Sequence, residues 1–166
     1  MPGDMRLNRL HDVIQIAMGW TDSHLHQFTV GTRSACIYFG VPDPEFDYIG
    51  SKTLNERRYT VANLAPIPKK KFIYEYDFGD DWEHEVIAEK ILPRDPVFKC
   101  PVCLAGANAC PPEDCGGTYG YYDLLKILGD PKHPSHEDMK EWIDEDFDST
   151  RFDLSEINTE LRRLKM

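Results

Sequence analysis

One stretch of the sequence decides the fold: Lys71-Phe72-Ile73-Tyr74-Glu75-Tyr76-Asp77-Phe78-Gly79-Asp80-Asp81-Trp82-Glu83-His84-Glu85-Val86-Ile87. Every second residue of its first half, from Phe72 to Phe78, is aromatic, which predicts a β-strand with one aromatic face. A Gly-Asp-Asp turn follows, and a second strand-like run begins at Trp82. We therefore predict a β-hairpin over residues 71–92.

The register of this hairpin follows from the length of its loop. A three-residue loop, 79–81, places Phe78 opposite Trp82, Tyr76 opposite His84 and Tyr74 opposite Val86, which keeps the aromatic residues together. A two-residue loop would place Tyr76 opposite Glu83 instead. We therefore predict the three-residue loop. The opposite face then carries Glu75, Asp77, Glu83 and Glu85. The repulsion between these like charges lowers stability unless water, a cation or basic side chains compensate it.

Helical and strand patterns surround the hairpin. Apolar residues recur at helical spacing over residues 5–18, and β-rich runs at 24–30 and 34–41 flank a predicted turn at 31–33. Residues 42–58 have a loop composition, and a short helix at 60–65 is weakly indicated. Three helices are predicted near the C-terminus: one ends at Gly129, one begins at Ser135, and one follows Asp153. The fold class is α+β: a largely antiparallel sheet of two hairpins, packed with an N-terminal helix and three C-terminal helices.

Length and charge restrict the class of protein. The 166 residues predict a single domain, 1–166, and no apolar segment is long enough to be a membrane span or a leader, so we expect a cytoplasmic protein. The net charge is −10, and residues 72–166 hold 22 acidic residues against 10 basic ones. Such a surface repels phosphate backbones, which argues against direct nucleic-acid binding and favours a protein partner on the acidic surface.

Four cysteines lie in one Pro- and Gly-rich segment, at Cys100, Cys103, Cys110 and Cys115. In a reducing compartment such a group favours a thiolate–metal site over disulfides, and zinc is the expected ion. The spacing of the second pair is irregular, so buried or idle thiols remain the alternative.

The hairpin also offers a hard-cation or hydrolytic centre. Carboxylates and a histidine near a turn can hold Mg²⁺ or Mn²⁺ and activate water, and the candidates here are Asp77, Asp80, Asp81, His84 and Glu89. The alternative is ordinary turn chemistry and solvated strand residues. Glu113 and Asp114 either join such a centre or cap the helix near Tyr119, and capping is the preferred interpretation. His24 and His26 are spaced as metal ligands can be, but no site is predicted there.

Several unusual short sequence motifs occur in one order along nearly the whole chain. They are Leu10-His11, Ala17-Met18-Gly19-Trp20, Ser23-His24-Leu25-His26-Gln27-Phe28, Tyr74-Glu75-Tyr76-Asp77-Phe78-Gly79-Asp80-Asp81-Trp82-Glu83-His84, Ala109-Cys110-Pro111-Pro112-Glu113-Asp114, Gly116-Gly117 and His133-Pro134 before Trp142. In these motifs the chain resembles the plasmid pRiA4b ORF-3-like family. Some members are labelled as insertion-element passenger or resolvase-like proteins, which implies an association with mobile DNA but no catalytic residues.

The chain departs from the family pattern in two ways. Members commonly carry strands before the Leu-His helix, and if these are absent an open sheet edge could pair with a second copy. The position of Cys100 is often not cysteine in relatives, which favours three cysteines with His84 as the fourth metal ligand.

Two functions follow. The first is a small accessory module, zinc-stabilised through the cysteines, that binds a protein and is not an enzyme. The alternative is a metal-dependent hydrolase or nuclease-like protein that uses Asp77, Asp80, His84 and Glu89. An enzyme predicts that Asp77, His84 and an acid from the cysteine segment converge in a cleft.

Overall fold

The computed structural model describes residues 1–32, 35–43, 52–97, 100–143 and 147–164. Its elements are α1 (Leu7–Met18), β1 (His26–Thr32), β2 (Ala35–Gly40), β3 (Leu54–Asn55), the 3-10 turn η1 (Glu56–Arg58), α2 (Val61–Leu64), β4 (Lys71–Tyr76), β5 (Trp82–Ile87), α3 (Gly117–Gly129), α4 (His136–Trp142) and α5 (Leu154–Arg163). The predicted α+β class is confirmed. Arg33 and Ser34, which belong to the predicted turn and strand start, lie outside the described residues.

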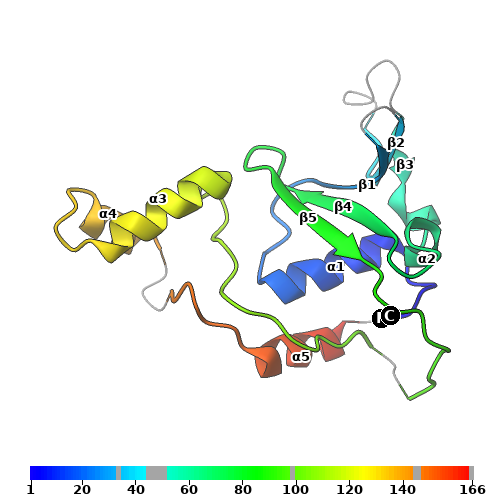
Figure 1. Cartoon of the computed structure of the whole chain (residues 1–166). Coiled ribbons are helices and arrows are strands. Elements are labelled where there is room, and N and C mark those ends of the chain that lie inside the picture. Colours follow the sequence, from blue (N-terminus) through cyan, green and yellow to red (C-terminus); the bar gives the residue numbers. More distant parts are fainter. Residues whose placement is uncertain (33–34, 44–51, 98–99, 144–146, 165–166) are drawn as a thin grey trace.

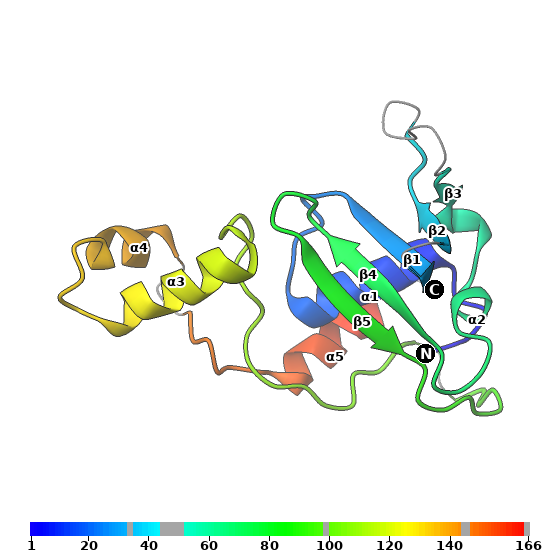
Figure 2. The ribbon, with the colours of Figure 1, turned by 45° about the horizontal axis from the view of Figure 1, so that its top comes forward.

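The sheet has the strand order β3-β2-β1-β4-β5. Its neighbours are antiparallel except β2 and β3, which are parallel. Helices α1 and α5 lie on one side of the sheet, whereas α3 and α4 extend away from it as a separate helical pair (Figures 1 and 2). The predicted pair of hairpins is therefore joined through β1 and β4, and one face of the sheet carries no helix from the described residues.

The hairpin register differs from the prediction. Tyr76 lies opposite Trp82, Tyr74 opposite His84, and Phe72 opposite Val86. The strands are thus shifted by two residues, and the connection spans residues 77–81. The physical reason is the turn itself: Asp77 leaves the strand with φ 57°, and its carbonyl accepts from the Asp81 amide at 2.7 Å. A shift of two keeps the side chains within the paired strands, 71–76 and 82–87, on their predicted faces, whereas Asp77 and Phe78 lie in the turn.

The core lies between α1 and the aromatic face of the sheet. α1 buries Leu7, Leu10 and Val13 against Phe28 and Tyr74. The helix ends at Gly19, whose φ of 89° lets it act as a left-handed C-cap. α5 adds the buried Leu161 to the same core. Phe78, which the alternation assigned to this face, lies beyond the strand end and is half exposed. In the described part of the chain no helix has the length and apolar character needed to cross a membrane.

A closed ring of hydrogen bonds joins α1, the turn before β1, and β4. The Asp22 amide donates to Gln15 Oε1 (2.9 Å), and Gln15 Nε2 donates to the Tyr74 hydroxyl oxygen (3.1 Å). Tyr74 OH lies 2.8 Å from His11 Nδ1, and His11 Nε2 lies 2.7 Å from Asp22 Oδ1. The carboxylate can only accept, so a neutral His11 donates from Nε2 and accepts the tyrosine proton at Nδ1. Burial lowers the pKa of His11, which favours this neutral form.

A second histidine extends the ring toward β3. His26 stacks on His11 with ring centroids 3.5 Å apart and planes 7° apart. Its Nε2 lies 2.8 Å from Oε2 of the buried Glu56, at the start of η1. The connection after β3 is thereby fixed to the same core.

Substitution of Tyr74 by Phe should destabilise the protein, because Gln15 Nε2 and His11 Nδ1 would lose their partner inside the core. Leaving buried polar groups unpaired costs about 1–3 kcal/mol. Chemical denaturation monitored by circular dichroism measures the change. Tyr59→Phe is the control, since Tyr59 packs on the same core against Phe39 and its hydroxyl has no hydrogen bond within the described chain. Equal effects of the two substitutions would contradict a special contribution of the ring.

The register also places Glu75 directly opposite Glu83. Burial raises the pKa of Glu75, and the nearby Asp81 and Glu83 raise it further. Ionisation of Glu75 therefore opposes folding: the cost is absent at low pH, where the group is protonated in both states, and appears as pH rises through the folded-state pKa.

Glu75→Gln should therefore stabilise the protein at pH 7, by up to about 1 kcal/mol, because it removes one of two opposed like charges. The gain should shrink toward pH 4. Urea denaturation at both pH values measures it, with the exposed Glu89→Gln as a control of equal charge change. A loss of stability at pH 7 would refute this interpretation.

Candidate functional site

Three of the hairpin residues predicted for catalysis, Asp80, His84 and Glu89, do not come together in one site. Asp80 Oδ2 accepts from the Gly116 amide at 3.0 Å, so it fastens the hairpin turn to the start of α3. His84 donates from Nδ1 to the Trp82 carbonyl (3.0 Å), packs edge-on against Trp20, and has a pKa lowered by burial. Glu89 is exposed beyond the end of β5.

Asp77 is the predicted residue that the structure brings into a cluster. Its Oδ2 lies 3.7 Å from His24 Nε2. Glu113 Oε2 lies 3.8 Å and Asp114 Oδ1 3.3 Å from the same nitrogen. We call these four residues the His24 site. Asp77 thus converges with acids from the cysteine segment, as the enzyme hypothesis required, but the histidine is His24 and not His84.

Two atoms of the His24 site are buried without a hydrogen-bond partner in the described chain: His24 Nε2 and Glu113 Oε2. An N–H···O hydrogen bond spans about 2.7–3.2 Å, so these separations are too long. Donor atoms that share one ion at about 2.1 Å lie about 3–3.5 Å from each other. His24, Asp77 and Asp114 are close enough to share one ion, whereas Glu113 is not in that group and lies beside it.

The hydrogen bonds around the site hold its donors in place. The Asp77 amide donates to the Leu25 carbonyl at 2.9 Å, which joins the hairpin to the segment before β1. Glu113 Oε1 accepts from the Thr21 amide (3.0 Å) and from the Tyr76 hydroxyl (3.0 Å). One oxygen of Glu113 is thus anchored, and the other faces His24. Burial, together with this contact, raises the pKa of Tyr76 to about 12, so its hydroxyl stays protonated and donates.

The preferred interpretation of Glu113 and Asp114 as helix caps is wrong. Gly116 is the N-cap of α3 and provides no side-chain bond. The Gly116-Gly117 pair has a steric reason instead. A Cβ on Gly117 would lie 2.3 Å from the Asp80 carbonyl oxygen, and its φ is 66°, so only glycine fits where the hairpin turn contacts α3.

A second group, His11, Asp22 and His26, is also close enough to share an ion. Its geometry is different, because His11 Nε2 and His26 Nε2 each make a contact of 2.7–2.8 Å with a carboxylate. Those are hydrogen-bond distances, and the nitrogens have no need of an ion. This group is best described as part of the core.

The four cysteines of the predicted zinc site are not gathered into one cluster. No three of their sulfur atoms lie within 4.8 Å of one another among the described residues, which include all four. Cys103 and Cys110 pack against the core. Burial raises the pKa of Cys110, and it raises that of Cys115 to about 11, so both favour the thiol over the metal-binding thiolate. His84, the predicted alternative ligand, is in neither candidate metal group.

Comparison with other proteins places the chain among relatives. It is 39% identical over 160 residues to y4hQ of Sinorhizobium fredii, a protein described as uncharacterised, and the match covers 95% of this chain and 78% of y4hQ. It is similar to the crystal structure of MM3350 from Methanosarcina mazei Go1, a protein of unknown function. That match has a TM-score of 0.78 and 34% identity, and covers 93% of this chain and 84% of MM3350. Residues 1–156 match the family described as Plasmid pRiA4b ORF-3-like protein. The resemblance predicted from the sequence motifs is thus confirmed: the chain belongs to the plasmid pRiA4b ORF-3-like protein family.

Proposed function

We propose that this protein binds one divalent cation at the His24 site and that the ion fastens the cysteine segment to the sheet. The observation that carries this proposal is the spacing of 3.3–3.8 Å around His24 Nε2, with two buried atoms that lack partners. Buried polar groups in native proteins are nearly always satisfied, so an unmet pair calls for an explanation. An ion held by His24, Asp77 and Asp114 supplies one for His24 Nε2.

The chemistry of the donors restricts the ion. Imidazole suits zinc and other transition metals, whereas carboxylates suit magnesium, calcium and manganese. One imidazole with two carboxylates therefore favours Zn²⁺ or Mn²⁺. The donors come from three separate segments: the turn before β1, the β4–β5 turn, and the loop before α3. An ion that joins them acts as a cross-link, so it stabilises the folded state in proportion to its affinity.

Isothermal titration of metal-free protein with Mn²⁺ and with Zn²⁺ should detect one high-affinity site. His24→Gln and Asp77→Asn should each weaken it at least about tenfold, because each removes a ligand. Asp123→Asn, an exposed acid on α3, is the control and should leave the affinity unchanged. Equal affinity in wild type and His24→Gln would overturn the proposal.

The cysteine zinc site remains a separate proposal, and the same protein can test it. Metal content of protein purified without chelator should fall in Cys103→Ser and Cys110→Ser if the thiols bind zinc. It should fall in His24→Gln if the ion is at the His24 site. The two sets of variants therefore assign the metal.

Metal-dependent hydrolysis is the second candidate function. The Asp114 side chain is 73% exposed, so an ion at the site would face solvent on that side. Asp114 also borders a groove of about 340 Å³ between α3 and α4, which Leu124, Met139 and Trp142 line. An ion with an open position can lower the pKa of bound water and activate it.

Hydrolysis of bis(p-nitrophenyl) phosphate in the presence of Mn²⁺ or Zn²⁺ tests this candidate. Turnover should disappear in Asp77→Asn and persist in Cys103→Ser. Full metal binding without turnover on phosphodiester or carboxylic ester substrates would leave the ion a structural cross-link in a binding module.

The remaining parts of the proposal rest on composition and family. All five cysteines are free thiols, which agrees with a reducing compartment, and we place the protein in the cytoplasm on that ground. An association with mobile DNA is implied by the family alone. With a net charge of −10 it would act through a protein partner and not through direct contact with DNA.

A further inference from the structure

We infer that the helix-free face of the sheet is a docking surface for an extended, lysine- or arginine-bearing segment of a partner protein, whose basic side chain enters a pocket beside Glu75. We call this the Glu75 face: the outward residues Gln27, Tyr38, Ile73, Glu75, Glu83 and Glu85. None of the four residues of the His24 site lines the pocket, so the inference is independent of metal binding.

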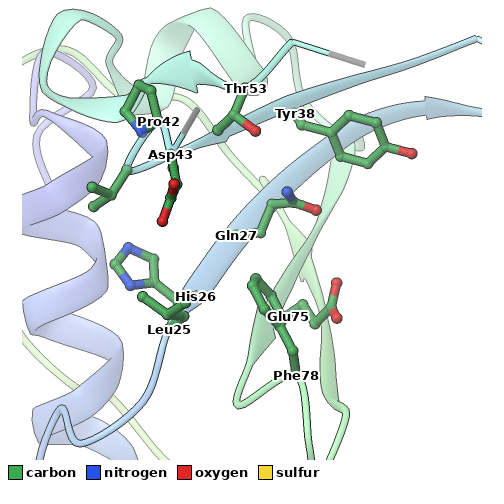
Figure 3. Close-up of a pocket in the computed structure, with 11 residues that line it drawn as sticks. Leu25, His26, Gln27, Tyr38, Pro42, Asp43, Thr53, Glu75 and Phe78 are labelled. Atoms are coloured by element: carbon green, nitrogen blue, oxygen red, sulfur yellow. The ribbon is translucent and has the colours of Figure 1, made fainter. Parts of the chain in front are cut away.

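The pocket has a volume of about 430 Å³ and lies at one end of this face. Figure 3 shows Glu75 and Asp43 on opposite sides of Gln27. Leu25, Val41 and Phe78, all at least half exposed, also line the pocket. No lysine or arginine is among the described residues that line it. Apolar walls with carboxylates and an aromatic ring suit a side chain with an alkyl stem and a cationic head.

Basic side chains of the described chain neutralise only part of the negative charge on this face. Glu85 pairs with Lys71, at the start of β4. Glu75 and Glu83 face each other across the two strands, and no ion pair to either is formed among the described residues. A guanidinium or ammonium group between them would replace a repulsion with two attractions, and the face is otherwise uncovered by helices (Figure 2).

An extended partner segment fits better than a second copy of this chain. The pocket is lined from β1, β2, β4 and the loops at their ends and by no residue of β5, so the partner segment would lie across the outer face, whereas a second copy would pair through the edge strand β5. Pairing two β5 strands would bring Glu83 and Glu85 of both copies together, on proteins that each carry −10. A strand with basic residues at alternate positions would instead oppose the glutamates with cations.

Fluorescence anisotropy with a labelled octapeptide of alternating lysine and valine tests the inference, at 50 mM and 300 mM NaCl. We expect saturable binding that weakens with salt. Glu75→Gln should reduce the affinity at least threefold, although the same substitution is expected to stabilise the fold. Glu137→Gln, which makes the same change in net charge on the exposed surface of α4, should reduce it less than 1.5-fold. Amide shifts confined to β1, β2, β4 and β5 in NMR would support the location.

Four results would overturn the inference. The first is no saturable binding at 50 mM NaCl. The second is an equal loss in Glu75→Gln and Glu137→Gln, which would mean nonspecific attraction to net charge. The third is that N-acetyl-arginine amide binds as tightly as the octapeptide, which would assign the pocket to a small cation. The fourth is a dimer in sedimentation that Glu75→Gln disrupts, which would assign the face to a second copy.

Discussion

The structure depends on the closed hydrogen-bond ring around Tyr74. A turn between a helix and a strand has many open conformations, but here Asp22 is held both by its backbone, through Gln15, and by its side chain, through His11. Because Tyr74 lies in the middle of β4, the ring fixes α1 against the sheet in one orientation. It also fixes the position of His24, only two residues after Asp22. The hydrogen bonds of the core therefore determine where His24 lies in the candidate site.

Two tyrosines on the same face of β4, Tyr74 and Tyr76, hold different segments of the chain. Tyr74 is fully buried and bonds within the core, whereas Tyr76, two residues later, directs its hydroxyl to the Ser23 amide and to Glu113. The first holds the turn before β1, and the second holds the segment before α3. In both cases the buried aromatic ring packs in the core, and the hydroxyl at its end makes the hydrogen bonds to a neighbouring segment. The aromatic stripe is thus core, as its alternation indicated, and also the support of the His24 site.

The sequence could predict those features that follow from the periodic spacing of apolar, aromatic and acidic residues in a helix or strand. Helical spacing located α1, α3, α4 and α5, and the alternation of aromatic and acidic residues assigned the faces of the β4–β5 hairpin. It could not predict the register, since the left-handed conformation of Asp77 that lengthens the connection leaves no trace in the pattern. Nor could it assemble His24 with Asp77 and Glu113, because three segments distant in sequence meet there. Local rules gave Glu113 a capping role, whereas a tertiary contact with Thr21 decides its place.

At two places in the described chain, buried or opposed charged groups lack a compensating partner, and both places involve the β4–β5 hairpin. At its turn, three carboxylates surround an imidazole without a hydrogen bond to its free nitrogen. On its outer face, Glu75 and Glu83 oppose each other. The buried His11–His26 pair shows that this fold can satisfy clustered ionisable groups when they serve structure alone. Proteins retain such local costs where function requires them. The two proposed cations, an inorganic one at the turn and a side-chain cation on the face, would relieve both costs, and on these proposals the acidic hairpin is the functional element of the fold.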